Sequence, residues 1–398
     1  MAQRTQSASG RREFLQSTAA TGGMLVLKPE TVFGTQANSA VELGVIGYGG
    51  RGEWVSGLFA EYTTTRVVAA ADPFADRLEA ARQQRKIDAS RLYKGLEGYH
   101  DLLTSRLDAV AIESPPYFHP EQAAAAVASG KHVYLAKPVA VDVAGCQSIQ
   151  ASGEKAKGRL SFLVDFQMRA SGVFQEAVRR VHGGAIGTPV LGHVFYHTGR
   201  LRPKHKPGMT AAEARLRNWV FDKALSGDII VEQNIHVIDV GNWYFNGHPL
   251  KAFGSGGRKG RTDVGDCWDH FVVTYWYPDD VRVDFSSAQF LKGFHDMCMR
   301  VYGVAGTVEA HYDGPVLITG DNPWKGADKD DTGRAGTIAN VKDFVESIRA
   351  GKHLNNAQAS VDSNLTAVLG RMAAYGEREV TWDEMLRTNE RLDAKLTP

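Results

Sequence analysis

The chain has 398 residues, 43% of them hydrophobic and 23% charged, with 46 Lys and Arg against 45 Asp and Glu. This length predicts two domains, and the composition is typical of a soluble globular protein and excludes disorder as the main state. A net charge of +1 argues against binding nucleic acid or a membrane surface through bulk charge. No stretch of the sequence approaches the roughly 20 apolar residues of a spanning helix.

The first 40 residues differ from the rest of the chain. Arg11 and Arg12 come shortly before Phe14 and Leu15, and a weakly apolar stretch and a group of small residues follow. This pattern resembles a twin-arginine export signal. We therefore expect residues 1–40 to be an export signal and linker, and the protein to be periplasmic, or cytoplasmic if the signal is not functional.

A glycine-rich turn follows the first predicted strand, residues 41–46. The sequence reads Gly47-Tyr48-Gly49-Gly50-Arg51-Gly52, and a helical pattern continues to Tyr62. Glycines with this spacing allow a tight turn, a close approach of pyrophosphate and close packing of the helix on the strand. The free N–H groups at the helix N-terminus would then face the phosphates. The turn therefore predicts a dinucleotide-binding site.

The second predicted strand, residues 66–71, ends in Asp72, which follows Gly52 by 20 residues. A carboxylate at this place can accept hydrogen bonds from the ribose hydroxyls of an adenosine. It would repel a 2′-phosphate, so the sequence favours NAD over NADP. Arg77 lies close enough in the chain to soften that preference.

The periodicity predicts two kinds of sheet. Strands and helices alternate as far as residue 135, which indicates a doubly wound parallel sheet in a Rossmann domain over residues 41–161. The remaining residues, 162–398, are rich in strands between residues 189 and 320 and predict an α+β domain with a large open, mostly antiparallel sheet. We therefore expect an α/β fold with an NAD-binding domain followed by an α+β domain.

Several stretches together are similar to the glucose–fructose oxidoreductase, inositol dehydrogenase and rhizopine-catabolism (Gfo/Idh/MocA) family. These stretches are Gly44–Gly52, Ala71–Pro73, Ala111–His119, Ala128–Ala140 and Asp165–Arg169. The resemblance implies an NAD(P)-dependent oxidoreductase that acts on a secondary hydroxyl of a sugar, glycoside or cyclitol, with a tightly bound, recycled NAD. It also implies that the second domain, residues 162–398, binds substrate and forms the subunit contacts of a homodimer or homotetramer.

The resemblance implies a catalytic role for Lys137, which follows Ala136 where family members usually carry Glu. It implies the same for His236 and Glu232, which lie four residues apart in a predicted helix, residues 230–239, so that both would share one face. Asp239 is within reach of the imidazole, so we expect a carboxylate to orient His236 as a base. The expected cofactor-binding residues are Gly47, Tyr48, Gly49, Gly50, Arg51, Gly52, Asp72, Ser114, Pro115, His119, Lys137 and Gln167. The expected substrate-binding residues are Arg169, Trp219 and Asp239.

Three alternatives stay open from the sequence. Glu232 and His236 could be metal ligands if a third ligand came from His197, His295 or Asp239, although we expect no metal. The enzyme could be an NAD-dependent glycosidase or lyase that oxidises its substrate transiently, with elimination and no net redox change. The chain could also be a non-catalytic nucleotide- or sugar-binding protein, since Ala136 replaces the usual Glu.

Overall fold

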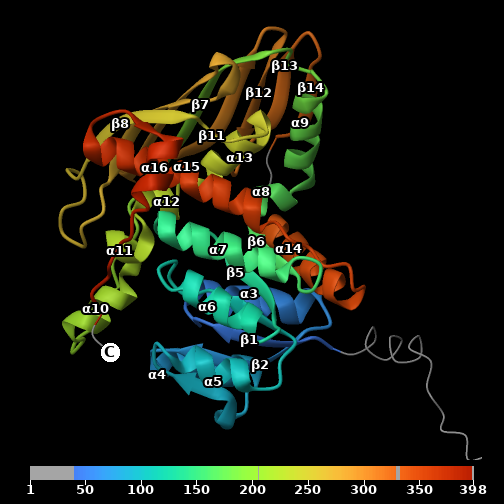
Figure 1. The fold of residues 1–398 in the computed structure, drawn as a ribbon, viewed down its shortest axis with the longest axis vertical. Coiled ribbons are helices and arrows are strands. Elements are labelled where there is room, and N and C mark those ends of the chain that lie inside the picture. The colour runs from blue at the N-terminus through green and yellow to red at the C-terminus, as the bar shows by residue number, and fades with distance from the viewer. Residues whose placement is uncertain (1–39, 205, 329–331, 397–398) are drawn as a thin grey trace, which may run out of the picture. The chain divides into compact units, whose positions relative to one another are not determined.

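The structure is a computed structural model that describes residues 40–396 except 205 and 329–331 (Figure 1). The predicted export signal with Arg11 and Arg12 lies outside the described residues. From Ala40 onward the described residues pack as one unit. Among them, no helix is both long enough and apolar enough to cross a membrane.

The first sheet is parallel and has six strands in the order β3-β2-β1-β4-β5-β6. Because β1 lies between β2 and β4, the chain reverses its winding direction at β1, which is where α/β sheets bind ligands. The strands are β1 (Glu42–Ile46), β2 (Arg66–Asp72), β3 (Leu92–Lys94), β4 (Ala109–Ile112), β5 (His132–Ala136) and β6 (Phe162–Asp165). The helices between them are α3 (Gly50–Tyr62), α4 (Ala75–Arg85), α5 (Gly98–Thr104), α6 (His119–Ala128) and α7 (Val143–Ala156).

The sixth strand lies beyond the domain boundary expected from the sequence, which fell between residues 161 and 162. Strand β6 pairs in register with β5, from Val133↔Phe162 to Ala136↔Asp165, and therefore belongs to the first sheet. This strand has only four residues, so its own hydrophobic pattern is too short to assign it to either sheet.

The second sheet has nine strands in the order β14-β13-β12-β11-β7-β10-β9-β8-β15. Strands β7 and β10 are parallel and the other neighbours are antiparallel. The strands are β7 (Pro189–Gly199), β8 (Lys251–Gly257), β9 (His270–Trp276), β10 (Arg282–Leu291), β11 (Asp296–Gly303), β12 (Gly306–His311), β13 (Val316–Gly320), β14 (Trp324–Ala327) and β15 (Val380–Thr381). The predicted fold class, a doubly wound parallel sheet followed by a mostly antiparallel sheet, is confirmed.

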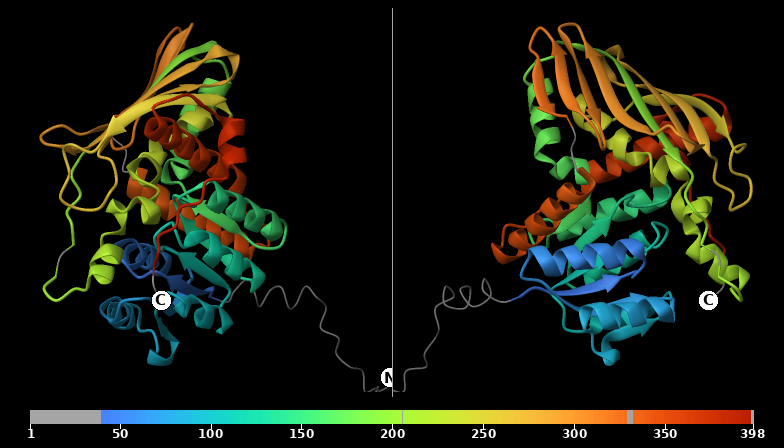
Figure 2. Two further views of the ribbon diagram at one scale, coloured as in Figure 1. Left: turned by 60° about the vertical axis from the view of Figure 1, so that its left-hand side comes forward. Right: turned by 180° about the vertical axis from the view of Figure 1, so that it is seen from behind.

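Helices cover one face of the second sheet and leave the other face open. Helices α13 (Ile235–Phe245) and α15 (Ala357–Gly376) lie in front of the sheet in Figure 1 and behind it in the right-hand view of Figure 2. Helix α15 also packs against α7 of the first domain. Its buried Arg371 donates hydrogen bonds to the carbonyl oxygens of Val141 and Gly227, at 2.7 and 2.8 Å. These contacts hold α15 of the second domain against the segment that connects β5 to α7 in the first domain.

Candidate active site

The glycine-rich turn is packed so closely that two of its positions exclude any side chain. Gly47 has φ +88°, and a Cβ there would lie 2.6 Å from the backbone nitrogen of Ser114. A Cβ on Gly52 would lie 2.0 Å from the carbonyl oxygen of Gly47. A Cβ on Gly50, in contrast, would meet no atom within 4 Å, because this residue faces a cleft. The turn thus presents open backbone to the cleft at the N-terminus of α3, as a bound pyrophosphate requires.

The cleft lies over the carboxyl ends of β1, β2 and β4, the place where open α/β sheets bind ligands. The expected cofactor-binding residues that line it are Gly47, Gly49, Gly50, Arg51, Asp72, Ser114 and Pro115. The structure therefore brings most of that set together. Tyr48 does not line the cleft: its side chain is buried, its hydroxyl donates to Gln84, and its N–H donates to Asp72.

Asp72 lies at one end of the cleft with its carboxylate held by the backbone. Its two oxygens accept hydrogen bonds from the N–H groups of Tyr48 and Phe74, both at 2.8 Å. Arg77 forms an ion pair with it at 3.5 Å. Burial raises the pKa of Asp72, and Arg77 and the two backbone donors oppose that effect. The side chain is therefore fixed at the cleft wall, where an adenosine ribose would lie.

A segment of the second domain closes the same end of the cleft. We call residues 200–221, apart from 205, the strap; it contains α10 (Ala211–Arg217), and its Lys204, Leu216 and Trp219 line the cleft. Arg217 forms an ion pair with Asp76 of α4 at 2.7 Å and lies 3.9 Å from the ring centroid of Phe74. Trp219, which we expected to bind substrate, thus lies against the dinucleotide cleft.

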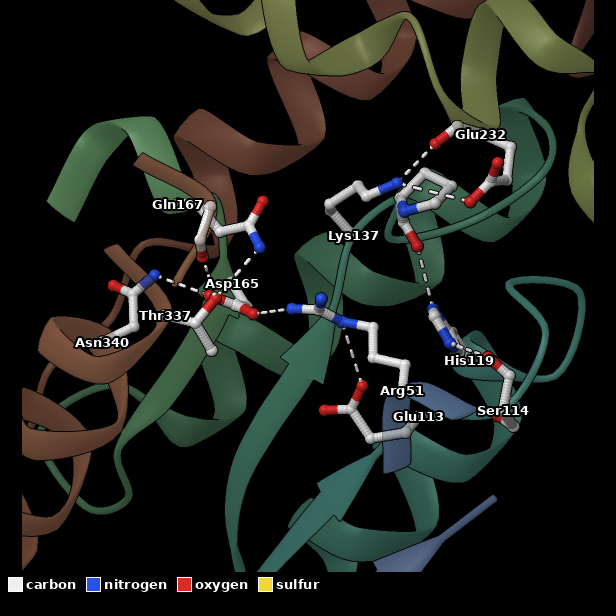
Figure 3. Close-up of polar contacts among 12 residues, drawn as sticks. Arg51, Glu113, Ser114, His119, Lys137, Asp165, Gln167, Glu232, Thr337 and Asn340 are labelled. Carbon is white, nitrogen blue, oxygen red and sulfur yellow. Dashed lines mark hydrogen bonds and ion pairs between the residues drawn. The ribbon is translucent and has the colours of Figure 1, made fainter. Parts of the chain in front are cut away.

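Lys137, which directly follows β5, contacts Glu232 (Figure 3). The Lys137 Nζ donates to the backbone oxygen of Glu232 at 2.6 Å and lies 3.3 Å from its carboxylate Oε1. Burial lowers the pKa of Lys137, and the Glu232 carboxylate opposes that effect. Glu232 therefore supplies the carboxylate that the adjacent position, Ala136, does not.

The predicted continuous helix through Glu232 and His236 is wrong. Helix α12 (Ile229–Glu232) ends at Glu232, and α13 begins at Ile235. In an unbroken helix the carbonyl oxygen of Glu232 would accept from the N–H of His236, but here Lys137 takes that oxygen. The amide of His236 turns instead toward the oxygen of Gln233, at 3.4 Å. Gln233 and Asn234 therefore interrupt the helix between the two residues.

His236 is buried without a carboxylate partner, which corrects the expected role of Asp239. Both oxygens of Asp239 accept from Arg169 at 2.9 Å, and Ser363 donates to one of them at 2.7 Å. The Nδ1 of His236 has no hydrogen-bond partner among the described residues. Burial lowers the pKa of His236 well below its ordinary value, and the charges of Lys137 and Arg51 add to this effect. The imidazole is therefore neutral at neutral pH.

Beneath Lys137, Arg51 joins two buried carboxylates at the carboxyl ends of β4 and β6, the strands on either side of β5 (Figure 3). It forms an ion pair with Asp165, which also accepts from Asn340 at 2.7 Å. Its Nε lies 3.3 Å from Glu113, whose two oxygens have no hydrogen-bond partner among the described residues. Burial raises the pKa of Glu113 to about 8. Glu113 lines the cleft and was missed from the sequence, although it is a charged residue at the end of a buried strand.

His119 and Gln167 lie behind the cleft wall. The two ring nitrogens of His119 lie 2.9 and 2.8 Å from the carbonyl oxygens of Pro138 and Ser114. Burial lowers the pKa of His119 to about 4, so the ring is neutral at neutral pH. A neutral ring can donate to only one of these two oxygens. Gln167 donates to Thr337 at 3.0 Å and accepts from Tyr312 at 2.8 Å. Both residues thus support the residues that border the site.

The alternative of a metal site has no geometric support in the part of the chain that the structure describes. No three His, Cys, Asp or Glu side chains converge there as metal ligands. His197 contacts Ser286 at 3.2 Å, and His295 contacts Thr198 at the same distance.

Two family models match the chain. The model described as "Oxidoreductase family, NAD-binding Rossmann fold" of the Gfo/Idh/MocA group matches residues 41–164, and the model of the Gfo/Idh/MocA C-terminal domain matches residues 174–309. The chain therefore belongs to the Gfo/Idh/MocA oxidoreductase family.

Its relatives of known name include inositol dehydrogenases. The chain is 27% identical over 212 residues to inositol 2-dehydrogenase of Acidothermus cellulolyticus, covering 53% of this chain and 56% of that protein. It is 24% identical over 317 residues to inositol 2-dehydrogenase of Pseudomonas savastanoi pv. phaseolicola, covering 78% and 87%. The match with the first of these spans little more than half of that relative.

Solved structures share the fold at low sequence identity. Aldose-aldose oxidoreductase of Caulobacter crescentus has a TM-score of 0.70 at 20% identity, over 86% of this chain and 99% of that chain. Scyllo-inositol dehydrogenase of Lactobacillus casei, solved with NAD(H) and scyllo-inositol, has a TM-score of 0.69 at 17% identity, over 87% and 100%.

Proposed function

We propose that this protein transfers hydride between a secondary hydroxyl of a cyclitol or sugar and an NAD that it holds tightly. The observation that carries the proposal is that the Lys137–Glu232 pair and the buried His236 lie within electrostatic range of Arg51, which lines the glycine-rich cleft. The similarity to inositol 2-dehydrogenases supports a cyclitol or a related polyol as the substrate.

The residues of the cleft fit a dinucleotide. The open backbone at Gly49 and Gly50 would receive the pyrophosphate, and Asp72 would receive the adenosine ribose. Asp72 at this place favours NAD over NADP. When bound, the nicotinamide would supply the hydride acceptor, and everything else in the reaction falls to the chain's own side chains.

In the oxidation direction, the substrate hydroxyl must lose its proton while its carbon loses hydride. The neutral imidazole of His236 would take that proton. The Lys137 ammonium, held by Glu232, would donate a hydrogen bond to the substrate oxygen as negative charge develops on it. Arg169, held by Asp239, lies on the same side and would contact further hydroxyls.

Tight retention of the cofactor is supported by the strap. Its ion pairs with Asp76 and its cleft-lining Lys204, Leu216 and Trp219 cover the adenosine end. Retention would suit an exported enzyme, because free NAD is scarce outside the cytoplasm, and export is the role we propose for Arg11 and Arg12.

We also propose a homodimer or homotetramer. The open face of the second sheet exposes large apolar side chains, among them Phe253 at 48% and Val272 at 53%. Exposed apolar side chains on a sheet face favour association with another surface.

The test is a single-turnover experiment with protein purified without added nucleotide. Addition of myo-inositol, scyllo-inositol or an aldose should reduce the bound cofactor, seen as NADH absorbance, for at least one compound. Release of the aglycone from an aryl glycoside with no lasting NADH signal would favour the glycosidase. No response to any compound in a protein that binds NAD would contradict the proposed reaction.

A further inference from the structure

The glycine turn has an acidic residue on each side, at equivalent places in the sheet. Ile46 of β1 pairs with Ala71 of β2 on one side and with Ile112 of β4 on the other. Asp72 and Glu113 are the next residues on those strands. Each carboxylate therefore stands beside Gly47, at the carboxyl edge of a strand that neighbours β1.

The two carboxylates differ in what they bind. Asp72 accepts two backbone hydrogen bonds. Glu113 lines the cleft with a fully buried side chain, and neither of its oxygens accepts a hydrogen bond within the described part of the chain. The Nε of Arg51, which also has no hydrogen-bond partner there, lies 3.3 Å from one oxygen as an ion pair. Buried carboxylate oxygens without donors are costly. The missing donors are therefore expected from a ligand in the cleft.

The position of Glu113 indicates which part of the ligand supplies them. The two nucleosides of a dinucleotide lie on opposite sides of a pyrophosphate, which would cross the glycine turn at the N-terminus of α3. Asp72 and the strap border one side, over β2. Glu113 borders the other side, over β4, next to the strand that ends before Lys137. The second ribose of the dinucleotide, with its two neighbouring hydroxyls, would lie on this side.

We propose that Glu113 accepts hydrogen bonds from the hydroxyls of the nicotinamide-side ribose, and so positions the reactive half of the cofactor. This inference rests on the proposed function, since it requires a nicotinamide dinucleotide in the cleft. Burial raises the pKa of Glu113 and the nearby Arg51 guanidinium opposes that effect, so Arg51 favours the ionised form of this carboxyl group beside a pyrophosphate.

Strand register offers a matched rescue position. Because Ile112 pairs with Leu135, Glu113 stands beside Ala136 on the neighbouring parallel strand, and in-register residues point to the same face of the sheet. A glutamate introduced at position 136 would therefore bring a carboxylate to the same edge. The variant E113A/A136E moves the carboxylate from the end of β4 to the end of β5. It tests whether ligand affinity depends on a carboxylate at this edge of the sheet, whichever of the two strands carries it.

The experiment measures calorimetric binding of AMP, ADP-ribose and NAD to protein stripped of nucleotide. ADP-ribose contains the second ribose and AMP does not. We expect E113A and E113Q to weaken ADP-ribose and NAD by about tenfold or more, as expected for lost hydrogen bonds to a charged acceptor, and to leave AMP unchanged. The double variant should regain part of the ADP-ribose affinity, and D72N should weaken all three ligands.

The possible failures are distinct. Unchanged ADP-ribose affinity in both Glu113 variants would overturn the role of Glu113 while leaving the proposed function intact. An equal loss for AMP and ADP-ribose would also overturn it, because it would mean general damage to the cleft. If the unmodified protein binds none of the three ligands, the proposed function fails as well.

Discussion

The two ends of the cleft are built differently. At the adenosine end, Asp72 is held by backbone donors and the strap is tied to Asp76 by ion pairs. At the other end, Glu113 and His236 are buried with polar atoms that have no partner among the described residues. Polar groups with partners have a fixed geometry that can hold a ligand, whereas buried polar groups without partners are available to the reacting part of a ligand. The comparison indicates that one end retains the cofactor and the other performs the chemistry.

The largest effect should come from removing the charge at the reacting end. Lys137→Met should reduce kcat by about 10³-fold, because the developing charge on the substrate oxygen loses its donor, while the bound NAD stays in place. Steady-state kinetics and the nucleotide content of the purified variant check both parts. Lys157→Met, at an exposed lysine, is the matched control. If Lys137→Met loses bound NAD as well as activity, Lys137 also retains the cofactor. That result would contradict the assignment of retention and reaction to different ends of the cleft.

Replacing the proposed base should have the next largest effect. His236→Gln should lower kcat by about 10²–10³-fold, the range of a general base. In the unmodified enzyme, activity should fall as pH decreases only below the ordinary imidazole range, because the pKa of His236 is lowered and the neutral form is the active one. A pH profile of kcat/KM measures this. An acidic limb centred above the ordinary imidazole pKa would contradict the assignment.

Glu232 should act through Lys137 and change the pH profile rather than abolish activity. Its carboxylate raises the pKa of Lys137 against the lowering by burial. In Glu232→Gln the pKa of Lys137 should fall further, so the alkaline limb of kcat, where the ammonium is lost, should move to lower pH. Glu232→Asp should restore part of the shift. An alkaline limb at the same pH in all three proteins would separate Glu232 from the protonation of Lys137.

The smallest effect on activity should come from substitutions in the strap, at the adenosine end of the cleft. Arg217→Gln removes an ion pair with Asp76 and a contact with the Phe74 ring. Partly exposed interactions of this kind contribute about 0.5–1 kcal/mol each, so the dissociation rate of NAD should rise a few-fold with kcat at saturating NAD unchanged. Stopped-flow displacement of bound NADH measures the rate. Asp76→Asn should give a similar rise, and a slower release in either variant would overturn the role of the strap.

Local sequence patterns were sufficient to predict the residues at the adenosine end of the cleft, around Asp72. They were not sufficient to predict the arrangement at the other end, around Lys137 and His236. The glycine spacing and the place of Asp72 follow from β1, the turn and β2, which are adjacent in the chain, and the structure places these residues together. The break between Glu232 and His236 depends on Lys137, which is 95 residues away and takes a helical carbonyl oxygen. The partner of Asp239 is Arg169, 70 residues away. No periodicity in the sequence reports such contacts.

Glu113 was missed for the same reason, and the sequence did not indicate where the strap lies. Glu113 appears in the sequence as one charged residue after a buried strand, and its relation to Gly47 and Ala136 exists only once β1, β4 and β5 pair. The basic stretch of the strap is equally consistent with a solvated loop until Arg217 and Lys206 are seen to reach Asp76. Long-range pairing of strands and domains thus determined what the local patterns left open.

The most direct test of the central claim is the nucleotide content of the protein purified without added cofactor. Denaturation followed by mass spectrometry should release NAD or NADH in an amount close to that of the protein, because the strap closes the adenosine end and the glycine turn holds the pyrophosphate. A protein that is empty on purification and also fails to bind added NAD would contradict the account.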